Sequence, residues 1–462
     1  MVRGILSRDQ VVAQRPAGLI WRIWPLLLTM LVFGGRAYAV PSFASQTGLP
    51  CQQCHTVAYG PALTEYGRQF KLNGYVFGQG KDPFPLALML QGGYSRTKAD
   101  QPDVAAPNYK VNNNVELSQV SLFVASRLTS HLGLFAQITY DGIGHAINWD
   151  NLDLRYARTF NVGDNALVAG FSVNNNPTVQ DLWNSTPAWG FPYISSALVP
   201  TPAAAPVIAG GLAQTVLGAT AYVSVNNRYY VEAGAYRGLS ANWLDKTGVG
   251  RDASPNLSGL SPYWRAAVQF SEGPSSYSVG AFGLDTKVQA DPTQPLKDHS
   301  TDFGFDATYQ YNAKGPHVFA VNASLIHERQ ELAESFAAGG SDAASNSLET
   351  ASVDLTYSYR RTWVGAVNAF STSGTTNNAL YNTAEAMNGS ASGSPDSSGY
   401  VLQAEYVPYG KLDSYARPWL NLRLGLQYTG YTKFNGGSSN YDGLGRNASD
   451  NNTMFAFFWV IL

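Results

Sequence analysis

The chain has 462 residues, of which 45% are hydrophobic, 13% aromatic and only 13% charged, and its net charge is −2. Residues 1–39 contain five Arg and one Asp, a charge of +4, so the rest of the chain carries −6, which argues against nucleic acid as a partner. The chain has two cysteines, both within residues 51–54, and this excludes a fold held together by a disulfide framework.

Residues 1–39 have the three parts of a secretory signal peptide. Four Arg residues precede the apolar run IWPLLLTMLVFGG, and Ala37-Tyr38-Ala39 provides a small-x-small cleavage site. The apolar run is shorter than the ~20 residues that a spanning helix needs. We therefore expect export, with a mature chain that begins near Val40, rather than an uncleaved membrane anchor.

Residues 51–55 read Cys-Gln-Gln-Cys-His, the C-x-x-C-H pattern of c-type haem attachment. In this pattern the thiols of Cys51 and Cys54 form thioethers with the haem vinyl groups, and His55 supplies an axial nitrogen ligand to the iron. A bare C-x-x-C can also be a redox dithiol or half of a zinc site, but neither a thioredoxin-like βαβ pattern nor a second Cys/His pair lies nearby. We expect one covalently bound haem c.

A short amphipathic helix is predicted after the motif. Pro61 can open it and Asn73-Gly74 can close it. Its apolar face would be formed by Leu63, Tyr66 and Phe70. Residues 40–81 contain too few apolar side chains for an independent core, so we predict a monohaem cytochrome c plug segment that needs a host.

The second axial ligand of the haem iron is not encoded in this segment, which holds no Met and no His except His55. Met89 is the nearest candidate in sequence, although an ordinary apolar strand residue is the simpler interpretation of a Met at that position. The other candidates lie further along the chain: His131, His145, His299, His317 and His327.

Beyond residue 82 the dominant pattern is two-residue alternation over runs of about ten residues. In residues 420–429, for example, Leu422, Leu424 and Leu426 alternate with polar residues. About sixteen such runs are centred near residues 90, 121, 136, 155, 169, 221, 233, 267, 282, 306, 322, 354, 367, 404, 425 and 457. The connections alternate between tight turns and long polar loops, as in outer-membrane barrels. The sequence therefore predicts an all-β fold: an antiparallel transmembrane β-barrel of about sixteen strands, porin-like, over residues 82–462, with a short N-terminal helical haem plug.

If the tight turns lie in the periplasm, the plug segment and the C-terminus lie on the periplasmic side together. The aromatic run of residues 454–462 would close the barrel against its first strand. The polar positions that alternate with the apolar ones are expected to face inward and to solvate an aqueous lumen: Asp153, Arg155, Arg265, Asp302, Asp306, Asp354, Glu405 and Arg423. The aromatic loop of residues 174–214 either folds inward over the plug or packs on itself outside.

The stretch FASQTGLPCQQCHTV, the following PALTEYGRQFKLNGY and a barrel of porin length resemble the fused monohaem cytochrome-porins of bacterial outer membranes, the family of the outer-membrane iron-oxidising cytochrome. The resemblance covers essentially the whole chain after residue 39 and is most specific around Cys51, Cys54 and His55 and in residues 68–75. It implies an outer-membrane electron conduit that oxidises an extracellular donor, ferrous iron, and passes electrons to a periplasmic c-type cytochrome.

A rival interpretation is a passive solute porin whose haem segment is only a plug or a redox sensor. Ion conductance that does not depend on the redox state of the haem would favour it. A soluble periplasmic electron carrier is a third interpretation, and the alternating strands argue against it. Both leading interpretations place the chain among outer-membrane lipids, and both are compatible with an oligomer.

Overall fold

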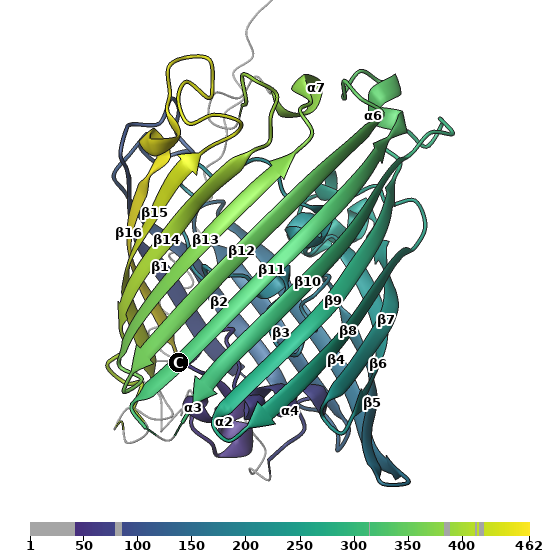
Figure 1. The fold of residues 1–462 in the computed structure, drawn as a ribbon, viewed down its shortest axis with the longest axis vertical. Coiled ribbons are helices and arrows are strands. Elements are labelled where there is room, and N and C mark those ends of the chain that lie inside the picture. The colour runs from purple at the N-terminus through teal and green to yellow at the C-terminus, as the bar shows by residue number, and fades with distance from the viewer. Residues whose placement is uncertain (1–41, 79–85, 314, 383–388, 412–413, 415–419) are drawn as a thin grey trace, which may run out of the picture. The chain divides into compact units, whose positions relative to one another are not determined.

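The computed structural model describes residues 42–78, 86–313, 315–382, 389–411, 414 and 420–462, so the predicted signal peptide lies outside the described residues. Sixteen strands in the described part of the chain close into one antiparallel barrel, in which every strand pairs with its sequence neighbours and β1 pairs with β16 (Figure 1). The predicted all-β, sixteen-stranded fold is confirmed. Each predicted strand centre falls inside an observed strand.

The strands are, in chain order, β1 (Leu86–Thr97), β2 (Asn114–Arg127), β3 (Leu132–Asp141), β4 (Ala146–Val162), β5 (Asn165–Asn174), β6 (Val216–Val225), β7 (Tyr229–Gly238), β8 (Ser261–Glu272), β9 (Ser275–Val288), β10 (Asp298–Asn312), β11 (His317–Leu332), β12 (Ser345–Tyr359), β13 (Trp363–Gly374), β14 (Ser397–Tyr406), β15 (Asn421–Lys433) and β16 (Thr453–Ile461).

The helices are short. They are α2 (Ser42–Thr47), α3 (Cys51–Cys54), α4 (Glu65–Leu72), η1 (Pro187–Trp189), η2 (Val207–Gly211), α5 (Ala241–Lys246), η3 (Arg251–Ala253), α6 (Ala333–Ala337), α7 (Asn378–Tyr381) and η4 (Ala448–Asn451). Within the described ranges, no helix is long and apolar enough to cross a membrane.

The connections at the two ends of the barrel differ in length. Six connections at one end are short, namely residues 128–131, 163–164, 226–228, 273–274, 313–316 and 360–362. The connection of residues 407–420 at the same end is longer. Because short connections face the periplasm in outer-membrane barrels, we assign this end to the periplasm.

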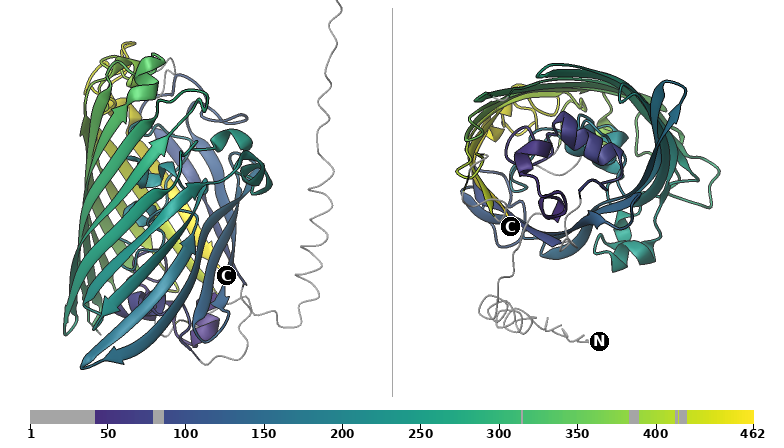
Figure 2. Two further views of the ribbon diagram at one scale, coloured as in Figure 1. Left: turned by 90° about the vertical axis from the view of Figure 1, so that its right-hand side faces the viewer. Right: turned by 90° about the horizontal axis from the view of Figure 1, so that it is seen from below.

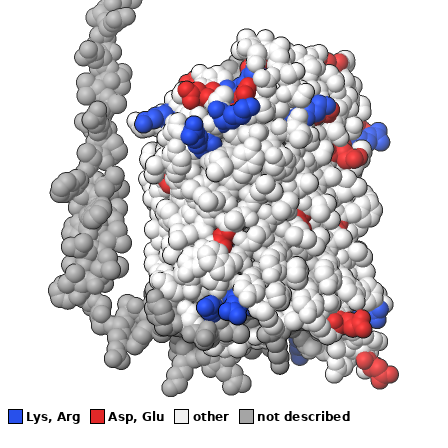
Figure 3. All heavy atoms as spheres, turned by 60° about the vertical axis from the view of Figure 1, so that its left-hand side comes forward, with Lys and Arg blue, Asp and Glu red and all other residues white. Residues whose placement is uncertain are grey.

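Side chains alternate between the barrel wall and the lumen as the sequence predicted. On β15, Arg423 and Gln427 are buried inside, whereas Leu424 and Leu426 on the outer face are 43% and 57% exposed. Figure 3 shows one side of the barrel as a nearly uncharged belt between a charged upper rim and charged residues near the lower edge. A closed barrel with an apolar outer belt spans a membrane without unpaired backbone groups, and this fold places the chain in an outer membrane.

The last strand closes the barrel. β16 pairs with β15 on one side and with β1 on the other, and Leu88 and Leu462 exchange two backbone hydrogen bonds of 2.9 and 2.8 Å. The aromatic C-terminal run therefore removes the free edge of β1, as predicted.

The plug helices α2, α3 and α4 lie within the ring of strands when the barrel is viewed from its periplasmic end (Figure 2). α4 begins after Thr64, whose Oγ1 accepts a hydrogen bond from the Gly67 amide, so the prediction that Pro61 opens the helix is wrong. A hydroxyl that satisfies a free amide at the helix start fixes the boundary more strongly than the φ preference of proline. The predicted end at Asn73-Gly74 is confirmed, since Asn73 caps α4 and Gly74 has φ +75°.

The long connection of residues 175–215, which we call the lumen loop, folds inward. Nζ of Lys71 on α4 donates to the carbonyls of Val179 and Asp181, and Nδ2 of Asn184 donates to the carbonyl of Pro61. Of the two arrangements that the sequence left open, the structure has the inward one. The lumen loop and the plug therefore pack against each other inside the barrel.

Candidate functional site

The C-x-x-C-H segment forms a single helical turn followed by extended backbone. α3 places Cys51 and Cys54 three residues apart, so both thiols lie on the same face of the helix. The helix ends at His55, which has φ −120° and ψ 142°. The chain then folds back on α3, because the amide of Thr64 donates to the Cys54 carbonyl (2.9 Å) and its Oγ1 donates to the Gln53 carbonyl (2.6 Å).

Gly67 allows α4 to lie directly against this motif. A Cβ atom at Gly67 would lie 2.3 Å from the carbonyl oxygen of Cys54, a distance that real Cβ contacts do not reach. The missing side chain therefore permits a close backbone approach. As a result, Leu63 and Phe70 line the same cavity as the two thiols.

The cavity has a volume of about 450 Å³ and is lined by the plug, the inner wall of the barrel and the lumen loop. This volume falls within the range of about 300–1,000 Å³ that is common for small-molecule and cofactor sites. Cys51, Cys54 and His55 all line it, so the structure brings the predicted motif residues together around one space. Its Phe, Tyr and Trp side chains are Phe43, Tyr59, Phe70, Tyr75, Phe123, Phe135, Trp189, Tyr193 and Trp459.

Met89 lines the same cavity from the barrel wall. It lies on β1 at an inward position, 5% exposed, and its Sδ accepts a hydrogen bond from Nε2 of Gln91 at 3.8 Å. None of the remaining histidines in the described part of the chain (His131, His145, His299, His317 and His327) is among the lining residues. The structure therefore distinguishes Met89 from the other candidates for a second ligand, which sequence distance alone could not do.

His55 is suited to bind a metal as a neutral imidazole. Burial lowers the pKa of His55 to about 4, the Gly60 backbone opposes this shift, and the charge of Arg423 adds to it. The Nδ1 atom is buried and has no well-formed hydrogen bond to the described residues. A neutral imidazole is the form in which histidine ligates iron.

The Cys54 thiol does not have the character of a reactive redox thiol. Burial, with a smaller contribution from Cys51, raises the pKa of Cys54 to about 12. Reactive C-x-x-C pairs depend on a lowered thiol pKa in an electropositive setting. This disfavours the redox dithiol that the sequence left as an alternative.

Tyr59 and Trp459 line the cavity, and together with Arg423 they hold the plug to the last strands. The Tyr59 hydroxyl donates to the Trp459 carbonyl, and Nη1 of Arg423 donates to the Tyr59 carbonyl at 2.9 Å. The guanidinium of Arg423 lies 4.8 Å from the Trp459 ring centroid, and Glu405 accepts two hydrogen bonds from it. A buried cation that is paired and stacked in this way fixes its neighbours firmly.

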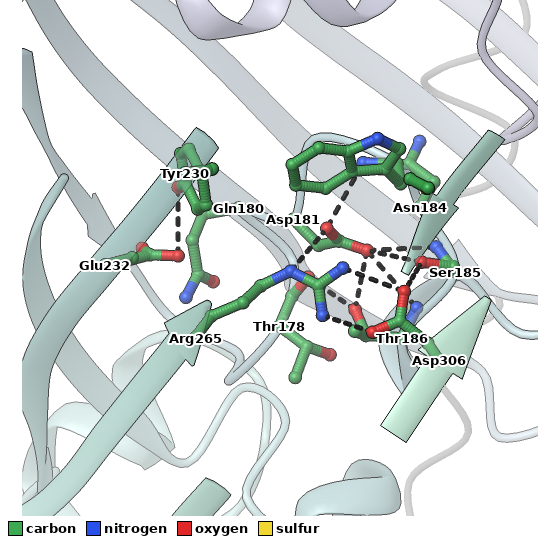
Figure 4. Close-up of polar contacts among 12 residues, drawn as sticks. Thr178, Gln180, Asp181, Asn184, Ser185, Thr186, Tyr230, Glu232, Arg265 and Asp306 are labelled. Atoms are coloured by element: carbon green, nitrogen blue, oxygen red, sulfur yellow. Dashed lines mark hydrogen bonds and ion pairs between the residues drawn. The ribbon is translucent and has the colours of Figure 1, made fainter. Parts of the chain in front are cut away.

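A second buried ion cluster anchors the lumen loop (Figure 4). Arg265 of β8 lies between Asp306 of β10, at 2.8 and 2.9 Å, and Asp181 of the lumen loop, at 3.1 Å. Asp181 also accepts hydrogen bonds from the amides of Ser185 and Thr186. One guanidinium thus joins two strands of the wall to the loop that covers the plug.

The expectation that the inward charged residues solvate an aqueous lumen is wrong for these groups. All are buried, and most pair with another charge or bond the lumen loop or the plug. Arg155 pairs with Asp153, Arg265 with Asp306, and Arg423 with Glu405, while Asp302 accepts from the Ile208 amide and Asp354 from Asn322. The physical reason is that the plug and the lumen loop fill the space around them, so charges that would otherwise face water must be paired.

Several residues of the site were not identified from the sequence as site residues. Tyr59 and Gly67 lie within the plug segment, Gln91 lies two residues after Met89, and Trp189 lies in the lumen loop. The aromatic content of the loop was a usable signal for Trp189. Gly67 has no local signature, because its importance comes from contact with a helix earlier in the chain.

No protein-family model matches the chain, and no curated protein matches it. Solved structures with a similar fold include Salmonella typhi OmpF in complex with daunomycin (12% identity, TM-score 0.44, covering 82% of this chain and 97% of that one). A loop L8 deletion mutant of OmpT, an outer membrane protein of Vibrio cholerae, has 11% identity and a TM-score of 0.42 over 82% and 98%. An anion-selective porin from Comamonas acidovorans has 12% identity and a TM-score of 0.41 over 81% and 98%. The strand pairing establishes the porin-like barrel independently of these similarities.

Proposed function

We propose that the chain carries one covalently attached haem c in its lumen and acts as an outer-membrane electron conduit of the fused monohaem cytochrome-porin type. The observation that carries this proposal is the single cavity lined by Cys51, Cys54, His55 and Met89. Two thiols on one helical face and a histidine directly after them are the groups that c-type attachment requires, and a largely apolar wall suits a porphyrin ring.

Each residue has a defined role in this proposal. Cys51 and Cys54 would tether the ring through thioethers, and His55 would bind the iron. Met89, on the barrel wall, would be the second iron ligand. When bound, the haem supplies a one-electron iron couple that the protein tunes through ligand identity and burial.

The barrel and the plug define the two sides between which electrons would pass. The apolar belt separates the outside from the periplasm, and the plug lies at the periplasmic end. We propose ferrous iron as the extracellular donor and a periplasmic c-type cytochrome as the acceptor. Ferric products are poorly soluble near neutral pH, so an oxidase benefits from releasing them outside the cell.

The test begins with protein made in a host that has a c-type maturation system. Haem staining after denaturation and the intact mass are expected to show one covalent haem, lost in Cys51→Ser/Cys54→Ser. Ferrous iron added to the oxidised protein in detergent is then expected to produce the reduced spectrum within seconds. His55→Ala is expected to abolish this response, whereas His131→Ala, an exposed histidine in a periplasmic turn, is expected to preserve it. A chain without covalent haem would refute the proposal, and reduction by dithionite but not by iron would refute iron as the donor.

A passive solute porin is the second candidate, and the barrel itself favours it. Closed sixteen-stranded barrels have an interior wide enough for an aqueous channel. The two candidates differ in what crosses the barrel, electrons or solutes. Conductance measurements therefore separate them.

A further inference from the structure

The outer wall of the barrel contains an apolar trough on β13–β16 that is separate from the lumen. Its floor is a row of directly paired residues on adjacent strands, namely Gly365, Ala404, Leu426 and Ala456. A Cβ atom at Gly365 would meet no heavy atom within 4 Å. Three of the four floor residues are thus Gly or Ala, and the surface is hollowed where most barrel positions carry a large apolar side chain.

Two rows of larger side chains border this floor. On the periplasmic side the paired residues are Tyr359, Trp363, Tyr406, Leu424 and Phe458, and on the other side they are Leu355, Val367, Leu402, Tyr428 and Met454. Two adjoining hollows of about 730 and 480 Å³ share Tyr357, Gly365, Ala404 and Leu426, so together they form one continuous trough. This face of the molecule lies on the nearly uncharged belt (Figure 3).

A cation lies at the periplasmic end of the trough. The guanidinium of Arg360 is 5.3 Å from the ring centroid of Tyr359, a residue of the trough wall. Arg360 is exposed and makes no ion pair with any described residue, whereas the adjacent Arg361 turns inward and donates to the Thr56 carbonyl. An unpaired arginine beside an aromatic girdle lies at the level of the lipid headgroups.

We propose that this trough is a binding site for an anionic phospholipid of the periplasmic leaflet. One acyl chain lies on the Gly365–Ala456 floor, and the lipid phosphate lies next to Arg360, whose planar guanidinium can bind phosphate through two hydrogen bonds. The positive charge of Arg360 favours an anionic phospholipid over a second copy of the chain as the occupant. An exposed, unpaired cation beside an apolar trough is complementary to a molecule that is apolar at one end and anionic at the other. The site does not depend on the proposed haem.

The test titrates purified protein in detergent with palmitoyl-oleoyl phosphatidylglycerol and measures bound lipid by native mass spectrometry. Wild-type protein is expected to keep one lipid more tightly than the rest. Gly365→Leu/Ala404→Leu fills the floor and is expected to weaken this binding by about tenfold or more, since it displaces several buried CH₂ groups of the lipid. Arg360→Gln is expected to weaken it by about three- to tenfold, since it removes a charge-assisted phosphate contact.

Two matched controls are available. Ala369→Leu makes the same kind of change on the outer face of β13 but outside the trough. Arg228→Gln removes another aromatic-stacked arginine of a periplasmic turn, 4.4 Å from the Phe270 ring. Both are expected to bind lipid as wild type does. Heat-dependent gel mobility checks that each barrel is folded.

Equal binding by wild type and the floor variant would overturn the proposal, and so would an equal loss in the controls. Sedimentation velocity tests whether a second copy of the chain occupies the trough instead. If the floor variant turns an oligomer into a monomer while lipid binding is unchanged, the trough holds a second copy of the chain and the proposal is wrong.

Discussion

Substitution of Met89 is the most direct test of the proposed second haem ligand. It lines the cavity together with the motif, and none of the five other described histidines does so. We expect Met89→Leu, which keeps size and apolarity, to leave the barrel and the covalent haem in place. The far-red sulfur-to-iron absorption band of the oxidised protein is expected to disappear and the haem potential to fall, because a Met ligand raises it.

A second methionine provides the control for this change. Met454 lies on the outer face of β16 and is 49% exposed, so Met454→Leu meets lipid instead of the cavity. The haem spectrum and haem potential of Met454→Leu are expected to match those of wild type. If Met89→Leu also matches wild type, Met89 is an ordinary strand residue and the second ligand is another group.

Gly67 tests whether the contact between α3 and α4 holds the motif in position. Because a Cβ atom there would overlap the Cys54 carbonyl, Gly67→Ala is expected to push the helices apart and to cost about 1–3 kcal/mol of overpacking. Limited proteolysis should then cut the plug faster, and the haem content should fall. Gly315→Ala, in a turn where a Cβ meets nothing within 4 Å, is expected to behave as wild type. Equal proteolysis of the two variants would show that α4 tolerates the shift.

Residues defined by local patterns could be predicted from the sequence, and residues defined by distant contacts could not. Cys51, Cys54 and His55 are adjacent in sequence and share one chemistry, so their pattern identified them without a fold. The importance of Gly67 depends on a neighbouring helix. The place of Met89 at the cavity depends on which face of β1 turns inward, and the two faces of a strand can be distinguished only when the barrel is closed.

Among elements, the lumen loop depends most on a single contact. Arg265 balances two buried carboxylates, Asp181 and Asp306. Arg265→Met is expected to leave both uncompensated and to cost about 3–5 kcal/mol, seen as a lower urea midpoint for unfolding. The loop should also become accessible to protease from outside.

The control for this prediction is an arginine whose ion pair is exposed. Arg329 pairs with Glu331 on the outer face of β11, with 68% of its side chain exposed. Arg329→Met is expected to change stability by less than about 0.5 kcal/mol. The double variant Arg265→Met/Asp306→Asn should recover part of the loss. If the double variant recovers no stability, and if Arg265→Met leaves the protease accessibility of the lumen loop unchanged, Arg265 does not anchor the loop.

The strands could be predicted because alternation is local and repeats sixteen times, whereas the filling of the lumen could not. The positions of Leu424 and Leu426 indicate which face of β15 contacts lipid, whichever strands β15 pairs with. By contrast, Arg265 meets Asp181 and Asp306 across separations of 84 and 41 residues, and no local pattern encodes such partners. The sequence therefore predicted correctly that these polar residues face inward, but the prediction that they contact water in the lumen was wrong.

At the scale of the whole molecule, hydrogen bonds from the barrel hold the plug in place. Gln310 donates to the Leu63 carbonyl (2.8 Å), Tyr222 to the Leu72 carbonyl (2.7 Å) and Arg361 to the Thr56 carbonyl (3.0 Å). These donors come from three different parts of the barrel. A lumen occupied in this way opposes the free passage of solutes, although the bare barrel is porin-like.

Planar-bilayer recordings test this consequence. We expect full-length protein to pass far less current than an open sixteen-stranded porin, in both redox states, and Cys51→Ser/Cys54→Ser to pass no more, because the plug is held by the barrel. Arg265→Met, which frees the lumen loop, is expected to raise the current, and Arg329→Met is not. A large wild-type current that ignores the redox state would instead favour the solute porin, since an open path for ions leaves the plug no role as a barrier. A small current together with reduction by ferrous iron would favour the electron conduit over the solute porin.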